Sequence, residues 1–121
     1  MKTIDVNEVN GVKFTGGTSF RTVLKKDKLG FAMMKTCIDK GGPYKWHYKN
    51  HQEACYCVSG KGYLEDLITG EVHQITEGIT YLVDKHQPHL FTAITDVVLI
   101  SVFNPALKGN ESHDSNGNYN L

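Results

Sequence analysis

The side chains best suited to chemistry are an acid, a phenol and an imidazole between residues 53 and 89. Glu53, Tyr81 and His89 carry oxygen and nitrogen donors that suit a divalent metal such as iron, manganese or zinc. Such a metal would keep open positions at which a substrate can bind. Each residue alone also has an ordinary structural role, since Tyr81 suits a barrel core and His89 suits a satisfied core position.

The geometry of a β-strand explains how these side chains can meet. Side chains alternate between the two faces of a strand, so we expect Glu53 to share its face with Cys55 and Cys57. An acid that points into an apolar interior is costly unless it is paired or bound to a metal. Tyr81 lies in a later apolar run, and His89 opens the run after that. The three donors can therefore converge on one cavity.

The spacing of certain residues matches a known two-part motif. The matching positions are a glycine, a histidine, an acid and a glycine, then a glycine and a histidine: Gly41, His47, Glu53, Gly60, Gly78 and His89. This spacing resembles the two sequence motifs of the cupin barrels. Lys49 stands where a second histidine is usual, and Asp84 and His86 stand where the second motif often has Pro and Gly.

The remaining sequence supplies strands for such a barrel. Short apolar or alternating runs recur between Gly, Pro, Asp and Asn residues, and none keeps helical spacing over three turns. Strands are predicted over residues 20–25, 30–38, 44–48, 53–59, 62–66, 72–75, 79–83, 89–93 and 97–103, with a turn at 40–43. Glycines such as Gly60 and Gly78 supply the positive φ of tight turns. The predicted fold is all-β, a double-stranded β-helix of the cupin (jelly-roll) type.

Composition limits the size and the partners of the protein. The 121 residues are 40% hydrophobic, which suits a single domain over residues 1–121. Thirteen basic and thirteen acidic residues balance without clustering, which argues against nucleic acid and membrane surfaces. No run suits a signal peptide or a membrane span, so we expect a cytoplasmic protein with reduced, buried thiols. Its partner is then a small molecule or a second copy of itself.

Longer segments carry a more specific resemblance. They read HYKNHQEACYCV at 47–58, EDLITGE at 65–71, DKH at 84–86, VFNP at 102–105, LKGNE at 107–111 and HD at 113–114. Together these segments resemble the ectoine synthase family, and the resemblance extends from about residue 20 to residue 119. It implies a cytoplasmic, homodimeric lyase that closes N-γ-acetyl-L-2,4-diaminobutyrate into ectoine with loss of water.

The resemblance also implies a set of site residues. It assigns the metal, Fe(II) with zinc or manganese as alternatives, to Glu53, Tyr81 and His89. The positions that contact substrate in the family correspond here to Arg21, Thr36, Tyr48, His51, Phe103, Glu111 and His113. Among them, Tyr48, His51 and His113 are candidates for acid and base catalysis.

The same resemblance gives roles to charged residues and to the C-terminal tail. Arg21 could pair with the substrate carboxylate, and Glu111 could hold the free amine. The composition of residues 108–121 alone indicates a flexible terminus. The resemblance implies instead that this tail folds over the barrel mouth as a lid that excludes water.

Three departures from the family pattern fall near the predicted substrate pocket. Residues 16–19 (GGTS) stand where the family carries a tryptophan, Ser101 replaces a cysteine, and residues 44–47 (YKWH) replace a Thr-His-Ile-His segment. Trp46 could restore an aromatic wall if its strand turns it inward. Two alternatives therefore stay open: a related metal-dependent lyase or cyclase acting on another small acylated amino acid, and a non-catalytic cupin that binds a small ligand.

Overall fold

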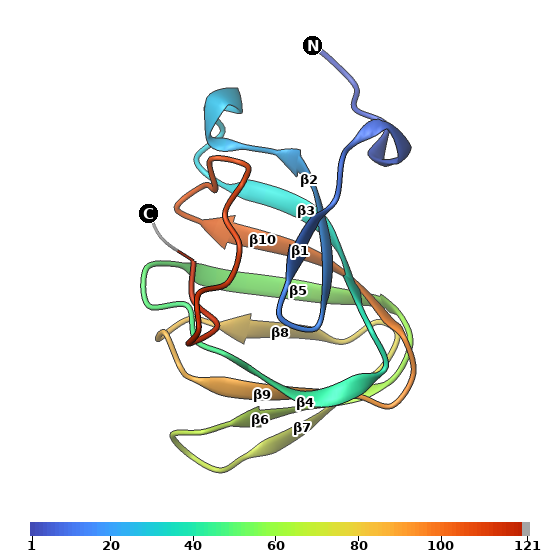
Figure 1. The fold of residues 1–121 in the computed structure, drawn as a ribbon, viewed down its shortest axis with the longest axis vertical. Helices are drawn as coiled ribbons and strands as arrows, with labels where there is room; N and C mark the ends of the chain where they lie inside the picture. The colour runs from blue at the N-terminus through green and yellow to red at the C-terminus, as the bar shows by residue number, and fades with distance from the viewer. Residues whose placement is uncertain (120–121) are drawn as a thin grey trace.

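A computed structural model describes residues 1–119. Two antiparallel sheets face each other across the interior of the protein (Figure 1). The six-stranded sheet has the order β1-β2-β3-β10-β5-β8, and the four-stranded sheet has the order β4-β9-β6-β7. The bounds are β1 Val12–Phe14, β2 Gly17–Val23, β3 Ala32–Ile38, β4 Gly41–Trp46, β5 Gln52–Ser59, β6 Gly62–Asp66, β7 Val72–Ile75, β8 Thr80–Val83, β9 His89–Ala93 and β10 Val97–Asn104. The all-β cupin prediction is confirmed.

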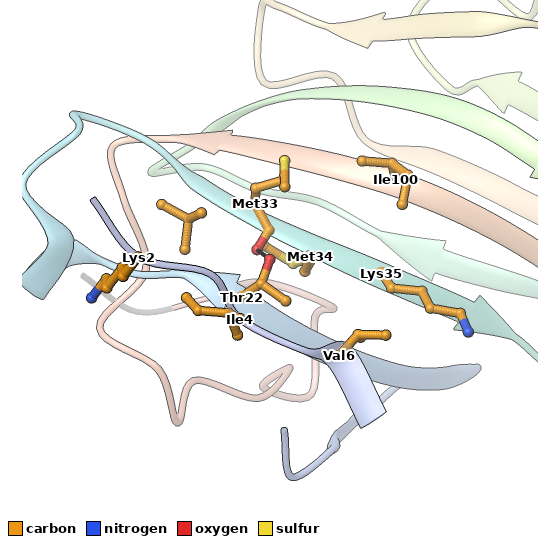
Figure 2. Close-up of a pocket in the computed structure, with 9 residues that line it drawn as sticks. Lys2, Ile4, Val6, Thr22, Met33, Met34, Lys35 and Ile100 are labelled. Carbon is orange, nitrogen blue, oxygen red and sulfur yellow. Dashed lines mark hydrogen bonds between the residues drawn. The ribbon is translucent and has the colours of Figure 1, made fainter. Parts of the chain in front are cut away.

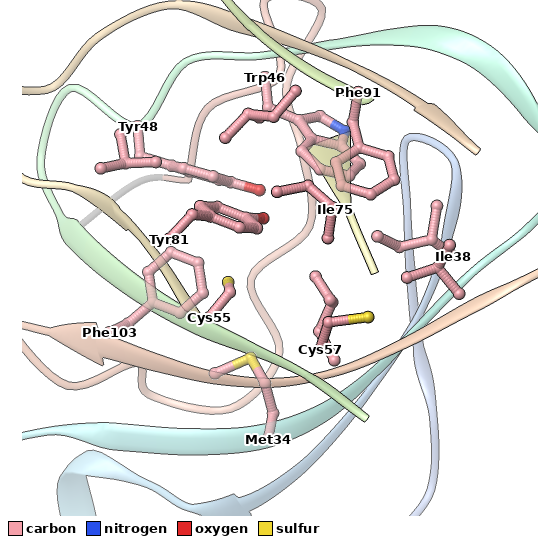
Figure 3. Packing of buried hydrophobic residues seen from close by; sticks show 14 of the residues in the cluster. Met34, Ile38, Trp46, Tyr48, Cys55, Cys57, Ile75, Tyr81, Phe91 and Phe103 are labelled. Atoms are coloured by element: carbon pink, nitrogen blue, oxygen red, sulfur yellow. The ribbon is translucent and has the colours of Figure 1, made fainter. Parts of the chain in front are cut away.

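The alternation of side chains along the strands builds the core. Every second residue of β10 from Val97 to Phe103 is buried, and Glu53, Cys55 and Cys57 occupy the buried face of β5. Figure 3 shows how the inward side chains of both sheets pack against one another. The predicted alternation of side chains along this strand, which places Glu53 inside the barrel, is therefore observed.

Several predicted boundaries were wrong. β1 was not predicted, because its three residues are at most half-buried and carry too short a pattern. β2 begins at Gly17 rather than residue 20, and β4 includes most of the turn predicted at 40–43. Gly41 and Gly42 have φ of +136° and +97°, and the pairing of β4 with β9 shifts register there. A bulge, rather than a turn, explains the glycines.

Two smaller features also differ from the sequence predictions. Single turns of 3-10 helix lie at η1 (Val6–Glu8) and η2 (Lys25–Asp27). All three cysteines are free, as predicted, but Cys37 is only half-buried because it lies on the outer face of β3. No helix within residues 1–119 has the length and apolar character needed to cross a membrane.

The C-terminal segment returns across the barrel after β10 (Figure 1). The amide of Lys25 donates to the Leu107 carbonyl at 2.8 Å, and the amide of His47 donates to the Gly117 carbonyl at 3.0 Å. Leu107 and Tyr119 are buried. The flexible terminus suggested by composition alone is therefore not what residues 107–119 form, and residues 120 and 121 of the predicted tail lie outside the described residues.

A groove near the N-terminus lies outside the barrel (Figure 2). It has a volume of about 380 Å³ and lies between the N-terminal segment and the outer side of β2, β3 and β10, with Ile4, Val6, Met33 and Ile100 among its lining residues. None of the residues predicted to bind metal or substrate lines it.

Candidate active site

The three predicted metal ligands come from three strands, two adjacent strands of one sheet and one strand of the other. Glu53 lies near the start of β5, Tyr81 lies in β8 beside β5, and His89 opens β9 in the opposite sheet. All three side chains are buried, with exposures of 8%, 8% and 2%. Within residues 1–119, each has a buried polar atom without a hydrogen-bond partner: Glu53 Oε1, Tyr81 Oη and His89 Nε2. Buried polar atoms are rarely left in this state.

The imidazole of His89 has its tautomer set by the backbone. Its Nδ1 lies 2.8 Å from the carbonyl oxygen of Gln87, so Nδ1 carries the proton and donates it. The lone pair is therefore on Nε2, the buried atom without a partner. Burial lowers the pKa of His89, which favours the neutral ring. A neutral imidazole oriented by a carbonyl on its other nitrogen is the usual form of a metal-binding histidine.

The two oxygen ligands are held in an environment that opposes their charge. Burial raises the pKa of Glu53 to about 7, although the thiol of Cys55 acts in the opposite direction. Burial likewise raises the pKa of Tyr81. A cation would remove this cost for both groups by pairing with the carboxylate and the phenolate. The donors present therefore fit a divalent metal.

This donor set is not a cluster of the commonest metal-binding residues. Among the residues described, no three His, Cys, Asp or Glu side chains are grouped as a metal site. The fit to a metal therefore depends on Tyr81 as the third donor, beside Glu53 and His89. A tyrosine ligand also explains why a buried phenol in this apolar wall has no hydrogen-bond partner.

The second motif contains a backbone feature that supports this site. His86 stands where the cupin motif often has glycine, and its φ is +55°, in the left-handed region that glycine favours. Its Nδ1 lies 2.9 Å from the Tyr48 carbonyl and 3.1 Å from the His51 carbonyl. His86 therefore ties the turn before His89 to the loop that carries two other predicted site residues.

Aromatic side chains line the remaining space next to Glu53 and Tyr81. The cavity there has a volume of only about 10 Å³, which is room for about one water molecule. Its aromatic walls are Phe14, Trp46, Tyr48, Phe103 and Tyr119. Trp46 does point inward: it is 2% exposed and its Nε1 donates to the Thr15 carbonyl at 2.7 Å. Trp46 therefore supplies an aromatic wall to a chain that has Gly16 and Gly17 where the family carries a tryptophan.

Arg21 lies buried beside the C-terminal segment. Its Nε donates to Ser19 Oγ at 3.2 Å, and its Nη1 donates to the Gly109 carbonyl at 3.1 Å. Glu111 Oε1 lies 3.7 Å from Nη1, and the guanidinium lies 5.3 Å from the centre of the Tyr119 ring. The remaining nitrogen, Nη2, is buried without a partner among the described residues. It is a free cationic donor at the edge of the cavity.

Glu111 is fixed by backbone amides. The amides of Lys108 and Gly109 donate to its two carboxylate oxygens at 2.6 and 2.8 Å. Burial raises the pKa of Glu111, but these amides outweigh burial and the pKa is lowered overall. The carboxylate is therefore ionised at neutral pH, beside the Arg21 guanidinium.

Tyr48 and His113 form a directional hydrogen-bond chain. Thr15 N–H donates to His113 Nδ1 at 3.3 Å, and His113 Nε2 lies 2.8 Å from Tyr48 Oη. Burial lowers the pKa of His113 to about 4, so the ring is neutral and its proton lies on Nε2. His113 then donates to Tyr48, whose own O–H is free to point elsewhere. Burial raises the pKa of Tyr48, which keeps that proton in place at neutral pH.

His51 has a different environment. It is 1% exposed, and its Nδ1 is buried without a partner. Its ring packs edge-on to Phe103 and Tyr119, with centroids 5.9 and 6.2 Å away. Burial lowers the pKa of His51, so a neutral imidazole is favoured. It is the buried histidine beside the cavity that is best placed to accept a proton.

Of the predicted site residues, Thr36, Tyr48, Glu53, Tyr81 and Phe103 line this small cavity. The others do not line it: Arg21, His51, His89 and His113 pack against its aromatic walls, and Glu111 lies beside Arg21. Sequence reasoning missed some of the walls. Tyr119 is 2% exposed and closes the cavity, and Phe14 and Ser19 also line it. The only sequence signal for Tyr119 was an aromatic residue in an otherwise polar tail. His47 is half-buried and is not among the residues that line the cavity.

Comparison with known proteins identifies the family of the chain. The family model described as ectoine synthase matches residues 2–121. Named relatives include the L-ectoine synthase of Desulfosudis oleivorans, 45% identical over 97% of this chain and 95% of the relative. That of Alkalilimnicola ehrlichii is 43% identical over 100% of this chain and 96% of the relative.

Solved structures show the same relationship. The ectoine synthase from P. lautus superposes with a TM-score of 0.85 at 34% identity, covering 90% of this chain and 81% of that one. An RmlC-like cupin from Shewanella frigidimarina, with a TM-score of 0.69 at 20% identity over 88% and 92% of the two chains, shares the fold. The chain therefore belongs to the ectoine synthase family of cupins.

Proposed function

We propose that this chain is a metal-dependent L-ectoine synthase that closes N-γ-acetyl-L-2,4-diaminobutyrate into ectoine, acting as a cytoplasmic biosynthetic enzyme. Full-length relatives carry the name L-ectoine synthase. The observation that carries the metal dependence is the set of three buried atoms without partners, Glu53 Oε1, Tyr81 Oη and His89 Nε2. They belong to one carboxylate, one phenol and one imidazole.

Glu53, Tyr81 and His89 would hold a divalent metal, Fe(II) in this proposal, with zinc or manganese as alternatives. When bound, the ion would supply Lewis-acid polarisation of the substrate carbonyl. His89 has a preset tautomer, and the acid and phenol lose the cost of burial when they pair with a cation.

Arg21 and Glu111 would orient the substrate. The free Nη2 of Arg21 can receive the substrate carboxylate as a charged hydrogen bond. The ionised carboxylate of Glu111 lies 3.7 Å from Arg21 Nη1 and would suit the ammonium group. Thr36 and Phe103 line the cavity and would contact the carbon chain and the acetyl group. Holding both ends of a flexible substrate brings its amine against its own amide carbonyl.

Ring closure forms one C–N bond and releases one water. The α-amine nitrogen bonds to the acetamide carbon, and the carbonyl oxygen leaves as water with two hydrogens taken from that nitrogen. His51, with a buried free nitrogen, is the proposed base that takes a proton from the ammonium group. Tyr48 is the proposed proton donor to the leaving oxygen. Its hydroxyl oxygen accepts a hydrogen bond from His113, so its own O–H remains available.

The C-terminal tail over residues 108–119 would act as the lid of this site. A cavity of about 10 Å³ is too small for the substrate while Tyr119 occupies it. Substrate entry therefore requires the tail to withdraw, and its return would exclude water from a dehydrating reaction. The hydrogen bond from the His47 amide to Gly117 marks where the tail closes.

A homodimer is also part of the proposal. The outer face of the six-stranded sheet carries Met33, Tyr56 and Leu82, which are 37%, 48% and 63% exposed. A broad apolar sheet face is a suitable surface for a second copy of the chain.

The test is a direct assay with defined metal content. Purified protein loaded with Fe(II) is incubated with N-γ-acetyl-L-2,4-diaminobutyrate, and ectoine is measured by chromatography. We expect ectoine from the loaded protein, and loss of both metal and product in Glu53→Ala, Tyr81→Ala and His89→Ala. Tyr63→Ala, at an exposed tyrosine of β6, is the control. If the metal-loaded protein forms no ectoine, the proposed substrate is wrong. The remaining functions are then a related cyclase or a protein that binds a small ligand without catalysis.

A further inference from the structure

A buried chain of hydroxyl and thiol groups crosses the inward face of the six-stranded sheet, next to the candidate metal site. Thr36 Oγ1 lies 2.9 Å from Ser101 Oγ, and Ser101 Oγ lies 3.3 Å from Cys55 Sγ. The three residues come from β3, β10 and β5, which are adjacent strands, and their exposures are 8%, 1% and 1%. The chain begins at a residue that lines the cavity, Thr36.

Cys55 brings this chain to the proposed ligands. It follows Glu53 on the inward face of β5, and it is the direct partner of Tyr81 across the pair of β5 and β8. Directly opposed side chains in an antiparallel pair lie in contact range. Figure 3 shows Cys55 beneath Tyr81 in the interior, whereas Cys57 lies nearer to Ile38. The Tyr81 hydroxyl is buried and has no hydrogen-bond partner among residues 1–119.

Either atom of each pair in this chain can donate, so the chain can run in either direction. Each hydroxyl or thiol has one proton to donate. If Thr36 donates to Ser101 and Ser101 donates to Cys55, the thiol proton is the one left over. The buried acceptors next to that thiol are the oxygens of Tyr81 and Glu53. In that direction the hydroxyl chain ends at the proposed metal ligands.

We propose that the Cys55 thiol donates a hydrogen bond to the Tyr81 oxygen and thereby acts as a positioning residue for this ligand. The proposal rests on the proposed function, because it takes Tyr81 to be a metal ligand. A second group that orients a ligand typically changes metal affinity or activity by about 10-fold to 100-fold. Ser101 and Thr36 take part through their hydrogen bonds. A bond donated by Thr36 to Ser101, and one donated by Ser101 to the Cys55 sulfur, leave the thiol proton free to point toward Tyr81.

The test is the charge-transfer absorption of the protein loaded with Fe(III), which reports directly on a tyrosine ligand. A hydrogen bond lowers the energy of the phenolate electrons, so its loss shifts this band to longer wavelength. We expect such a shift in Cys55→Val, together with a loss of iron affinity of about 10-fold or more. Cys55→Ser keeps a donor and should return the band toward its original position.

Cys57→Val is the matched control. Cys57 is also buried on the inward face of β5, but its thiol donates to the Ser59 carbonyl at 3.4 Å, away from Tyr81. It should leave the band unchanged. If Cys55→Val and the original protein have the same band, the proposal is wrong while the tyrosine ligand stands. If the Co(II)-loaded protein shows thiolate charge transfer that Cys55→Val removes, Cys55 is itself a ligand and the positioning role is wrong.

One further result would separate the two proposals. If the original protein binds Fe(III), by metal analysis, but shows no phenolate band, then Tyr81 is not a ligand. That result overturns the ligand set as well as the role of Cys55.

Discussion

At the scale of single residues, the site combines polar atoms that are buried without partners. Glu53, Tyr81 and His89 are the clearest cases. Burial of an acid without a partner has a cost in stability that depends on pH, because only the charged form is penalised. The raised pKa of Glu53, about 7 against an ordinary 4.5, means that the folded metal-free protein is less stable above pH 7 than it would be with a neutral residue at this position.

Replacing this acid by an amide should therefore stabilise the metal-free protein at high pH. Below pH 4.5, Glu53 is protonated in both folded and unfolded states, so Glu53→Gln has little effect. Between pH 4.5 and 7 the folded protein retains the proton longer, and the original protein loses stability as pH rises. At pH 8 we expect Glu53→Gln to be more stable by at most about 3 kcal/mol, measured by urea unfolding with chelator present.

Glu65→Gln, a half-buried acid of β6, is the control for that experiment. A stability difference for Glu53→Gln that does not change between pH 4 and pH 8 would contradict the buried, unpaired state of the carboxylate.

A second prediction at the residue scale concerns the effect of the Tyr48 hydroxyl on kcat. Because His113 donates to Tyr48, the phenol proton is available for the leaving oxygen. We expect Tyr48→Phe to lower kcat by about 100-fold with metal content unchanged, in the ectoine assay. Tyr63→Phe, at the exposed tyrosine of β6, should retain full activity. A Tyr48→Phe enzyme within twofold of the original would exclude the proposed donor.

At the scale of elements, the C-terminal segment is the part of the structure that closes the site. Backbone and amide contacts hold it to the loop after β4: the Lys49 amide donates to Asn118 Oδ1 at 2.9 Å, and Asn50 Nδ2 donates to the Tyr119 carbonyl at 3.2 Å. The Tyr119 ring then stacks on Tyr48 with centroids 5.0 Å apart. Residues 109–113 are also held by Lys13, Thr15 and Arg21, so local opening is expected mainly over residues 114–119.

Loss of the Tyr119 ring should release this segment without unfolding the barrel. In Tyr119→Ala we expect the amides of His47 and Lys49 to exchange hydrogen at least about 10-fold faster, because their acceptors lie in the tail. Amides of β10 should be unaffected. The measurement is hydrogen exchange by NMR, with Tyr63→Ala, at the exposed tyrosine of β6, as the control. Unchanged exchange at His47 and Lys49 would show that Tyr119 does not hold the lid.

At the scale of the whole molecule, the outer face of the six-stranded sheet has an apolar band. Met33, Val102, Ala54 and Leu82 lie opposite one another across β3, β10, β5 and β8. Such a row is unusual on a surface that meets only water. It supports the homodimer of the proposed function, and it lies on the side of the sheet away from the site.

A charge in this band should disrupt the dimer. We expect Leu82→Arg to convert the dimer to a monomer in light scattering coupled to size exclusion, because a buried unpaired arginine at an interface is costly. Ile68→Arg, at a 71% exposed residue in the turn between β6 and β7, should leave the assembly intact. A protein that is monomeric before substitution would contradict the homodimer outright.

Much of the barrel could be predicted from local patterns. The strands corresponding to β5, β6, β7, β9 and β10 follow from alternation and glycine-bounded runs, because side-chain direction in a strand has a period of two. The same period and the motif spacing select Glu53, Tyr81 and His89 as candidates. β1 and the start of β4 could not be predicted, since a three-residue edge strand and a glycine bulge carry little local pattern.

The sequence by itself determined the all-β class, the family resemblance and the candidate ligands, because these depend on residue type and spacing along the chain. Only the tertiary structure decided the direction of Trp46, the burial of Tyr119 in the cavity, and the link from Thr36 through Ser101 to Cys55. These features depend on contacts between residues far apart in the sequence. Their partners are chosen by the pairing of strands and the path of the tail, which no local pattern specifies.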